Sequence, residues 1–355
     1  TERASAMGAT QSASCCAGRR RPPRKVDTRR RSAMPKVSIA LMGNSLLYYN
    51  DVPRLLEAFG GSDLFDQGVV EQDSCLRGGV DLRELLARGN GMDEKFGEED
   101  PGAPDVASLL SRHWDYVVMN DYTQAPARAA SRRASIDVLV HQIAPMLRRC
   151  GGTPILLETW AYLFPSKGSD DLGDHAEFSA RLQQGYREYA AALARALPKE
   201  MAPRIAKVGT AFLAVREQRK ALWPELYHSD GMHPSPIGSY LEGLVIYATV
   251  FGSLPSCAAS VPDDPSYLWS RARRMQPPAA PPNRLPTVEE MHFLRHVAAS
   301  VCAVPDDSPK VMHLKSPSAA EGVEGGKGRN YLGFSSGVQE VSPTSLYHKR
   351  PTSSA

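Results

Sequence analysis

Three residues from distant parts of the chain have the side chains of a serine nucleophile and its supporting groups. Ser45 follows Gly43 and Asn44, and much later in the chain Asp230 and His233 are separated by only two residues. A serine hydroxyl is a poor nucleophile at neutral pH, so it needs a base within hydrogen-bond reach and a third group that orients this base. The residue types predict Ser45 as nucleophile, His233 as general base and then acid, and Asp230 as the orienting carboxylate.

The elements on either side of these residues favour the same arrangement. Val37, Ile39 and Leu41 alternate with smaller residues and predict a buried strand that ends at the Gly43 turn, so that the Ser45 hydroxyl lies at its carboxyl end. Ligands of α/β proteins bind beyond the carboxyl ends of such strands. After His233 the sequence predicts a helix capped by Ser235 and started by Pro236. Its expected apolar face consists of Ile237, Tyr240, Leu241, Leu244, Val245 and Ala248.

An ester hydrolase also needs donors that stabilise the oxyanion, and losing one costs roughly 3 kcal/mol. Three groups at predicted strand ends are candidates: the backbone N–H of Ser45, the backbone N–H of Gly79, and the side-chain amide of Asn120. Gly78 is an alternative to Gly79, since either glycine lets the backbone approach a substrate closely.

Aromatic residues that follow the strand ends are candidates for substrate binding, namely Tyr48, Tyr122 and Trp160, although they can equally be packed beneath the loops. His228 is close enough in sequence to Asp230 to compete with His233 for it. The remaining histidines have no metal-ligand spacing, so neither a metal nor an organic cofactor is expected.

Two short blocks resemble the first and last blocks of the SGNH hydrolases, also called GDSL-type esterases: GNS after the first strand and DGMHPS near the end. The strings GNSLLYYNDVP, WDYVVMND, LLETWAY and HPSPIGSYLEGLVIYATVFG resemble an uncharacterised SGNH-like branch, and the likeness covers roughly residues 36–252. It implies a three-layer αβα domain with a flavodoxin-like parallel sheet of about five strands, and a serine esterase, lipase or carbohydrate deacetylase that works through an acyl-enzyme. Two positions depart from the family pattern: Asn44 replaces the commoner Asp, and Val118 replaces the glycine that usually precedes Asn120 by two residues.

Strands and helices alternate along the chain, which independently predicts a parallel sheet with helices on both faces. The interval at residues 89–104 is polar and is expected to be a loop. Strands are expected at Val37–Leu41, Leu64–Gln72, Tyr116–Met119, Ile155–Trp160 and Ile205–Val208, and helices at Pro53–Phe59, Leu82–Ala87, Val106–Arg112, Arg128–Arg149, His175–Leu197, Ala211–Lys220 and Val288–Val301.

Composition divides the chain into a globular domain with polar ends. Residues 1–35 form a basic arm that is either a targeting segment or without function, and 304–355 are predicted to be disordered. The domain is expected at 36–303, with a Pro-rich linker at 276–286 and a last helix at 287–302. The arm lacks the apolar core of a secretory signal, so an intracellular location in the cytoplasm or an organelle is favoured.

The formal net charge is only +3, and much of the basic excess lies in the arm, which argues against a domain that binds nucleic acid. No apolar run is long enough to span a membrane. The expected partner is therefore a small-molecule or carbohydrate ester. Six cysteines without paired spacing favour reduced thiols, with a Cys75–Cys150 or Cys257–Cys302 bridge left open.

Three other functions compete with hydrolysis. The acyl group can be transferred to a sugar hydroxyl instead of water. The fold can also be catalytically degenerate and bind a carbohydrate or acyl ligand without turnover, which the two departures from the family pattern favour. Finally, the polar arm and tail can make the chain a scaffold.

Overall fold

The computed structural model describes residues 36–60, 70–164, 170–275 and 284–306. Five strands form one parallel sheet in the order β2-β1-β3-β4-β5. The strands are β1 (Val37–Gly43), β2 (Val70–Leu76), β3 (Tyr116–Met119), β4 (Thr153–Leu157) and β5 (Arg204–Ala206). The predicted α/β parallel sheet of about five strands is thus confirmed. The predicted arm, the tail from residue 307 and most of the Pro-rich linker lie outside the described residues.

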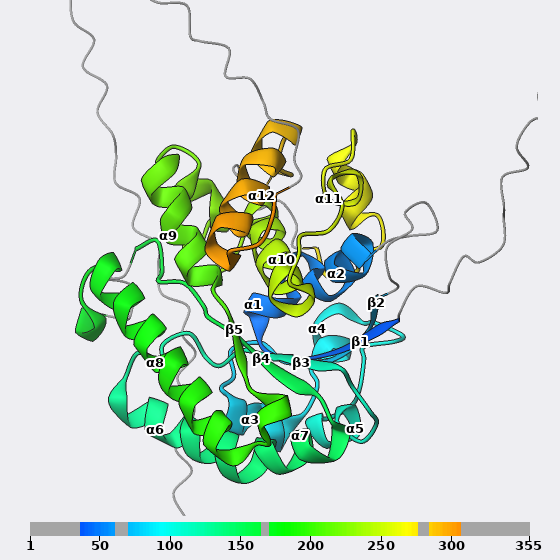
Figure 1. The fold of residues 1–355 in the computed structure, drawn as a ribbon, viewed down its shortest axis with the longest axis vertical. Coiled ribbons are helices and arrows are strands. Elements are labelled where there is room, and N and C mark those ends of the chain that lie inside the picture. Colours follow the sequence, from blue (N-terminus) through cyan, green and yellow to red (C-terminus); the bar gives the residue numbers. More distant parts are fainter. Residues whose placement is uncertain (1–35, 61–69, 165–169, 276–283, 307–355) are drawn as a thin grey trace, which may run out of the picture. The chain divides into compact units, whose positions relative to one another are not determined.

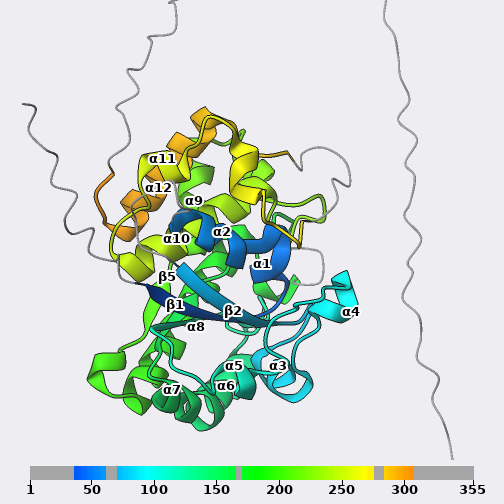
Figure 2. The same cartoon turned by 90° about the vertical axis from the view of Figure 1, so that its right-hand side faces the viewer.

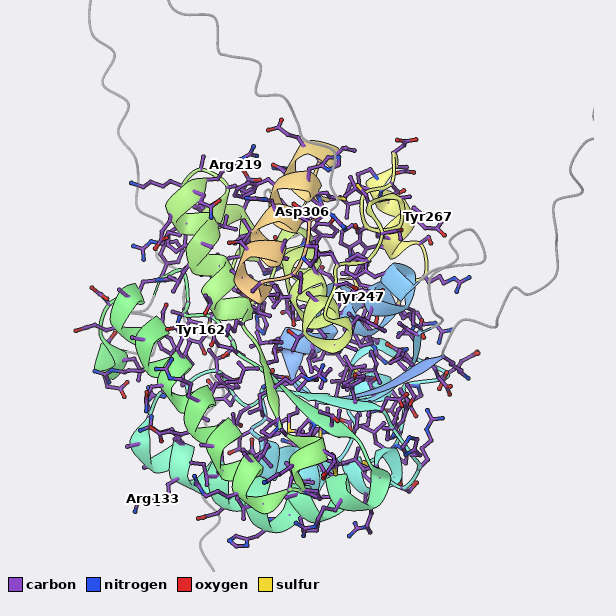
Figure 3. The ribbon with its side chains drawn as sticks, viewed as in Figure 1. Arg133, Tyr162, Arg219, Tyr247, Tyr267 and Asp306 are labelled. Atoms are coloured by element: carbon purple, nitrogen blue, oxygen red, sulfur yellow. The ribbon has the colours of Figure 1, made fainter. Side chains whose placement is uncertain are left out.

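Helices cover both faces of the sheet and make the three layers visible in Figures 1 and 2. One layer contains α3 (Leu82–Arg88), α5 (Val106–Leu109), α6 (Ala129–Val138), α7 (Ala144–Cys150) and α8 (His175–Ala196). The other contains α1 (Ser45–Tyr48), α2 (Val52–Gly60), α9 (Val208–Gln218), α10 (Pro236–Phe251), α11 (Cys257–Ser260) and α12 (Val288–Cys302). Side chains fill the space between the sheet and each layer, and Arg133 of α6 points outward from the molecule (Figure 3). Within the described residues no helix is long and apolar enough to cross a membrane.

Successive side chains of β1 contribute alternately to two separate hydrophobic cores, one on each face of the sheet. Ile39 and Leu41 of β1 pack into the core beneath α2 and α10, whereas Ala40 and Met42 pack into the core on the other face. All four side chains are at most 1% exposed. Successive side chains of a strand point to opposite faces, so a strand covered on both sides is apolar throughout.

The helix that follows His233 is more deeply buried than its sequence pattern predicts. α10 contacts β4 and β5 on one side and α2, α9 and α12 on others, so almost its entire circumference is covered rather than a single face. The predicted cap is present: the Ser235 hydroxyl accepts from the N–H of Gly238 at 3.3 Å, and Pro236 is the first helical residue. The loop carrying His233 therefore leads into a firmly held element.

Several predicted boundaries differ from the observed ones. The second strand is Val70–Leu76 rather than Leu64–Gln72, and residues 61–69 lie outside the described part. The predicted loop at 89–104 contains the short helix α4 (Met92–Phe96). The last strand is Arg204–Ala206, and α9 begins at Val208.

The helix predicted at Arg128–Arg149 contains a π-helical segment at Leu139–Ile143 between α6 and α7. Pro145 follows this segment and lacks a backbone N–H, which removes one hydrogen bond of a regular α-helix and explains the local change of winding. Among the described cysteines, no disulfide joins Cys75 to Cys150 or Cys257 to Cys302.

Candidate active site

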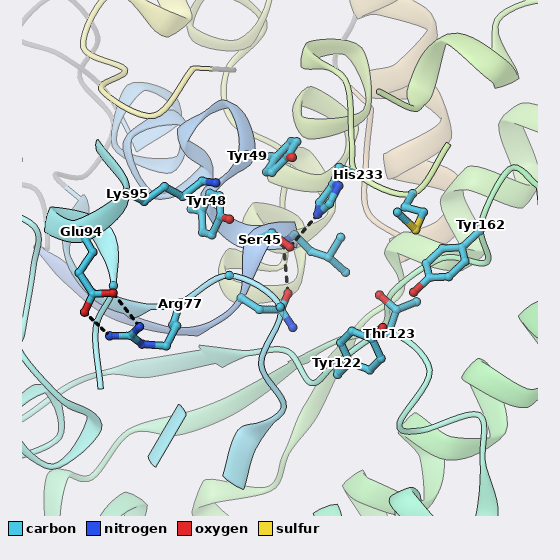
Figure 4. A pocket seen from close by; sticks show the side chains of 16 residues that line it. Ser45, Tyr48, Tyr49, Arg77, Glu94, Lys95, Tyr122, Thr123, Tyr162 and His233 are labelled. Atoms are coloured by element: carbon cyan, nitrogen blue, oxygen red, sulfur yellow. Dashed lines mark hydrogen bonds and ion pairs between the residues drawn. The ribbon is translucent and has the colours of Figure 1, made fainter. Parts of the chain in front are cut away.

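Ser45, His233 and Asp230 lie side by side beyond the carboxyl end of β1. Nε2 of His233 is 2.8 Å from Oγ of Ser45, and Nδ1 of the same ring is 2.6 Å from Oδ2 of Asp230. Figure 4 shows the first of these contacts at the centre of a pocket. With Nδ1–H directed to the carboxylate, Nε2 carries the lone pair that can accept the serine proton.

Asn44 places the serine at the start of α1. Its Oδ1 accepts from the N–H of Leu46 at 3.2 Å and caps the helix. Its amide nitrogen donates to the carbonyls of Val80 and Asp121, at 3.1 and 3.2 Å. Asn44 therefore connects the ends of three neighbouring strands, and because it is 3% exposed these hydrogen bonds are shielded from water.

A tight loop presents Asp230 and His233 together. Oδ1 of Asp230 accepts from the N–H groups of Met232 and His233, at 2.8 and 2.9 Å, which closes a turn around the carboxylate. Gly231 has a φ of +72°, a conformation that favours glycine, and a side chain there would come within 2.9 Å of Phe164. The spacing Asp-Gly-x-His is thus set by backbone geometry as well as by chemistry.

The carboxylate of Asp230 remains ionised beside the imidazole. Burial alone would raise its pKa, but the hydrogen bond from the His233 ring, the charge of that ring and the backbone N–H groups together hold the pKa of Asp230 well below its ordinary value. His228 also approaches this carboxylate, but its Nδ1 is 3.4 Å from Oδ2, against 2.6 Å for His233. The shorter contact assigns the carboxylate to His233.

Two residues outside the predicted triad hold the imidazole in place: Tyr49, one of the aromatic residues that follow the strand ends, and Asn50, which the sequence pattern did not single out. The ring of Tyr49 stacks on that of His233, with centroids 4.0 Å apart and an interplanar angle of 8°. Nδ2 of Asn50 donates to the carbonyl of Pro234 at 3.1 Å and to Oγ of Ser239 at 2.9 Å. For Asn50, its place a few residues after the Gly-Asn-Ser turn was the only signal in the sequence.

The pocket around Ser45 and His233 has a volume of about 570 Å³. At one end Arg77 forms a bidentate ion pair with Glu94, both contacts at 3.0 Å, and Lys95 lies beside it (Figure 4). The lining of the pocket includes the predicted residues Tyr48, Tyr122 and Gly79, together with Asn44, Leu46, Tyr49, Gly78, Gly91, Thr123, Tyr162 and Met232. The described residues contain no group of three or more His, Cys, Asp or Glu arranged to hold a metal ion.

Trp160, predicted among the substrate contacts, does not line this pocket. Its ring is 2% exposed and stacks on Phe212 at a centroid distance of 4.4 Å. Its Nε1 donates to the carbonyl of Met232 at 3.0 Å. Trp160 therefore supports the Asp230–His233 loop from beneath.

The expected oxyanion donors are only partly available. No acceptor among the described residues engages the backbone N–H of Ser45 or Gly79, and Gly79 has a φ of +70° on an exposed turn. The amide of Asn120 differs from the prediction: its Nδ2 donates to Oδ1 of Asn44 at 2.7 Å and to the carbonyl of Asp121 at 3.1 Å. Both of its protons are engaged and its side chain does not line the pocket, so Asn120 holds Asn44 instead.

The fold resembles those of several solved structures. No family model matches the chain, and no curated protein matches it. A DUF4886 family protein from Bacteroides uniformis is 16% identical, with 72% of this chain and 99% of that chain covered and a TM-score of 0.50. A "putative SGNH hydrolase" from Slackia heliotrinireducens is 28% identical, with 61% of this chain and 99% of that chain covered and a TM-score of 0.43. The chain shares the fold of the DUF4886 family protein, with its five-stranded parallel sheet between helices.

A further similar structure is that of an acetyl xylan esterase from Geobacillus stearothermophilus, which is 15% identical, with 61% of this chain and 94% of that chain covered and a TM-score of 0.39. At such identities the likeness concerns the fold alone. The chemistry of this chain has to be argued from its own residues.

Proposed function

We propose that the protein is a serine ester hydrolase that acts through an acyl-enzyme. The continuous contact from Asp230 through His233 to Ser45, at 2.6 and 2.8 Å, carries this proposal. Oγ of Ser45 attacks the ester carbonyl carbon while its proton passes to Nε2 of His233, and the carbonyl electron pair moves to the oxygen. When this tetrahedral intermediate collapses, His233 returns the proton to the leaving alkoxide.

The second half-reaction uses the same groups. Water replaces the alcohol, His233 removes its proton, and attack on the acyl carbon releases the acid and regenerates Ser45. Asp230 stays ionised throughout and stabilises the imidazolium, in keeping with its lowered pKa. The pocket volume of about 570 Å³ lies in the range typical of small-molecule sites, which supports a small or carbohydrate-linked ester as substrate.

A fluorophosphonate probe tests the proposal, because it reacts only with an activated serine. We expect the probe to label the wild type, and we expect no labelling and no p-nitrophenyl acetate hydrolysis in Ser45→Ala or His233→Ala. Ser229→Ala is the matched control, since Ser229 is an exposed serine next to His228 and should leave labelling unchanged. Hydrolysis at the wild-type rate by Ser45→Ala would refute the proposal.

Ligand binding without turnover is the second candidate function, and the engaged amide of Asn120 is the observation that favours it. This alternative predicts that the folded wild type is not labelled at Ser45. Acyl transfer to a sugar hydroxyl predicts labelling together with an acylated sugar among the products.

A further inference from the structure

Tyr48 brings a hydroxyl group next to the nucleophile from the same short helix. It lies three residues after Ser45 in α1, and residues three apart share one face of a helix. Both line the pocket, and in Figure 4 the Tyr48 hydroxyl points toward Ser45. The nearby Ser45 side chain lowers the pKa of this hydroxyl, against the larger effect of burial.

The same hydroxyl lies against the glycine turn on the opposite side. A Cβ atom added to Gly78 would be 2.7 Å from Oη of Tyr48, so glycine is required at this position if the hydroxyl is to stay where it is. Gly79, whose N–H is a candidate oxyanion donor, follows directly. The Tyr48 hydroxyl is therefore located between Ser45 and the Gly78–Gly79 turn, which is where the oxyanion has to form.

The ring of Tyr48 is held rigidly and its hydroxyl stays protonated. The side chain is 2% exposed, packs edge-on against Phe96 with centroids 5.7 Å apart, and lies 5.5 Å below Nζ of Lys95. Burial, and secondarily the neighbouring Tyr49, raise its pKa well above that of an exposed tyrosine. A fixed, neutral donor inside a pocket is the kind of group that stabilises developing negative charge.

We propose that the Tyr48 hydroxyl donates a hydrogen bond to the oxyanion, in the role that the sequence assigned to Asn120. This inference rests on the proposed ester hydrolysis. As the bond between Oγ of Ser45 and the carbonyl carbon forms, the oxygen gains the electron pair of the broken π bond. The Tyr48 hydroxyl then donates to that oxygen beside the N–H groups of Ser45 and Gly79, and no proton is transferred.

The test compares Tyr48→Phe with Tyr116→Phe, because Tyr116 is the first residue of β3, at the amino end of the strand, and does not line the pocket. Loss of one oxyanion donor lowers kcat by about 100-fold. We expect this loss in Tyr48→Phe, with KM within threefold of wild type and the affinity for phenylboronic acid, which forms a tetrahedral anion on the serine, reduced by a similar factor. Tyr116→Phe should keep both kcat and boronate affinity within threefold.

Gly78→Ala is a second variant, which displaces the Tyr48 hydroxyl without removing it. It should also lower kcat. If Tyr48→Phe and Gly78→Ala both keep kcat and boronate affinity within threefold of wild type while Ser45→Ala is inactive, the Tyr48 inference is wrong and ester hydrolysis stands. If Ser45→Ala hydrolyses esters as fast as wild type, the proposed function itself fails, and the role of Tyr48 fails with it.

Discussion

Replacing Asn50 by alanine should both destabilise the protein and slow the reaction. The Asn50 amide donates two buried hydrogen bonds, to the Pro234 carbonyl and to Oγ of Ser239, and each contributes about 1 kcal/mol net. Asn50 also has φ 54° and ψ 20°, a left-handed conformation that costs alanine about another 1 kcal/mol. We therefore expect Asn50→Ala to lower the free energy of unfolding by about 3 kcal/mol.

The kinetic effect follows from the position of Pro234, directly after His233. Without the Asn50 amide the loop is free to shift relative to Ser45, and a displacement of about 1 Å of a reacting group costs roughly 100-fold in rate. Asn50→Gly separates the two contributions, because glycine adopts the left-handed conformation easily but makes no hydrogen bond. Its unfolding free energy should exceed that of Asn50→Ala by about 1 kcal/mol, while its kcat is equally low.

Urea unfolding followed by circular dichroism measures the stabilities, and p-nitrophenyl acetate hydrolysis measures kcat. An Asn50→Ala variant would contradict both expectations if its unfolding free energy lay within about 0.5 kcal/mol of wild type and its kcat within a factor of about two. Such a change in stability is smaller than the loss of one hydrogen bond, and such a change in kcat is far smaller than the loss expected from a displaced loop.

Three further predictions concern the loop and the core. Asp230→Asn should lower kcat by about 10⁴-fold because a neutral amide cannot stabilise the imidazolium, whereas His228→Ala should stay within a factor of about three; equal losses would contradict the assignment of the carboxylate. Trp160→Phe removes the hydrogen bond to Met232 and should lower kcat by about tenfold with KM unchanged, by the same displacement argument; an unchanged kcat would show that the loop does not need this support. Glu242 is fully buried and has no hydrogen-bond partner in the described part of the chain, and burial raises its pKa well above 4.5, so the folded state keeps a proton that the unfolded chain releases as pH rises. Stability of the wild type should therefore fall relative to Glu242→Gln by up to about 1.4 kcal/mol per pH unit from pH 4.5 to the folded pKa, and urea unfolding curves with the same pH dependence for both proteins would contradict this.

The sequence predicted the parallel sheet and the residues that meet around Ser45 because the signals there are local. Alternation in Val37–Leu41 defines a buried strand, and the Gly-Asn-Ser turn defines its end and the position of the serine. The Asp230–His233 spacing defines a turn, and the Ser235 cap defines the helix behind it. Each of these features needs only a few consecutive residues.

The predictions for Asn120 and Trp160 depended on side-chain direction, which is not local. Position in sequence puts Asn120 at the end of β3, but its amide turns to Asn44, because its Oδ1 accepts from the backbone N–H of Asn44 while its Nδ2 donates to Oδ1 of Asn44. Trp160 follows β4 as expected, yet its ring lies beneath the loop because Phe212 of α9 provides a face to stack on. Both partners come from distant parts of the chain.

The misplaced elements have similar causes. β2 is at the edge of the sheet, where polar residues such as Glu71, Gln72 and Asp73 are tolerated and hide the strand pattern. α4 has only five residues and little helical signal of its own. The ion pair between Arg77 and Glu94 connects it to the turn after β2, a tertiary contact that no short window of sequence contains.

The wide separation of Ser45 and His233 along the chain has a consequence for biosynthesis. The two residues are 188 positions apart, and all five strands are translated before the ribosome reaches the imidazole. A nascent chain that ends after β5 therefore holds the complete sheet and the serine but has no base to activate it. The proposed ester cleavage can begin only after the Asp230–His233 loop has emerged and α10, which follows it, has inserted against the sheet. The onset of activity would therefore report the insertion of α10.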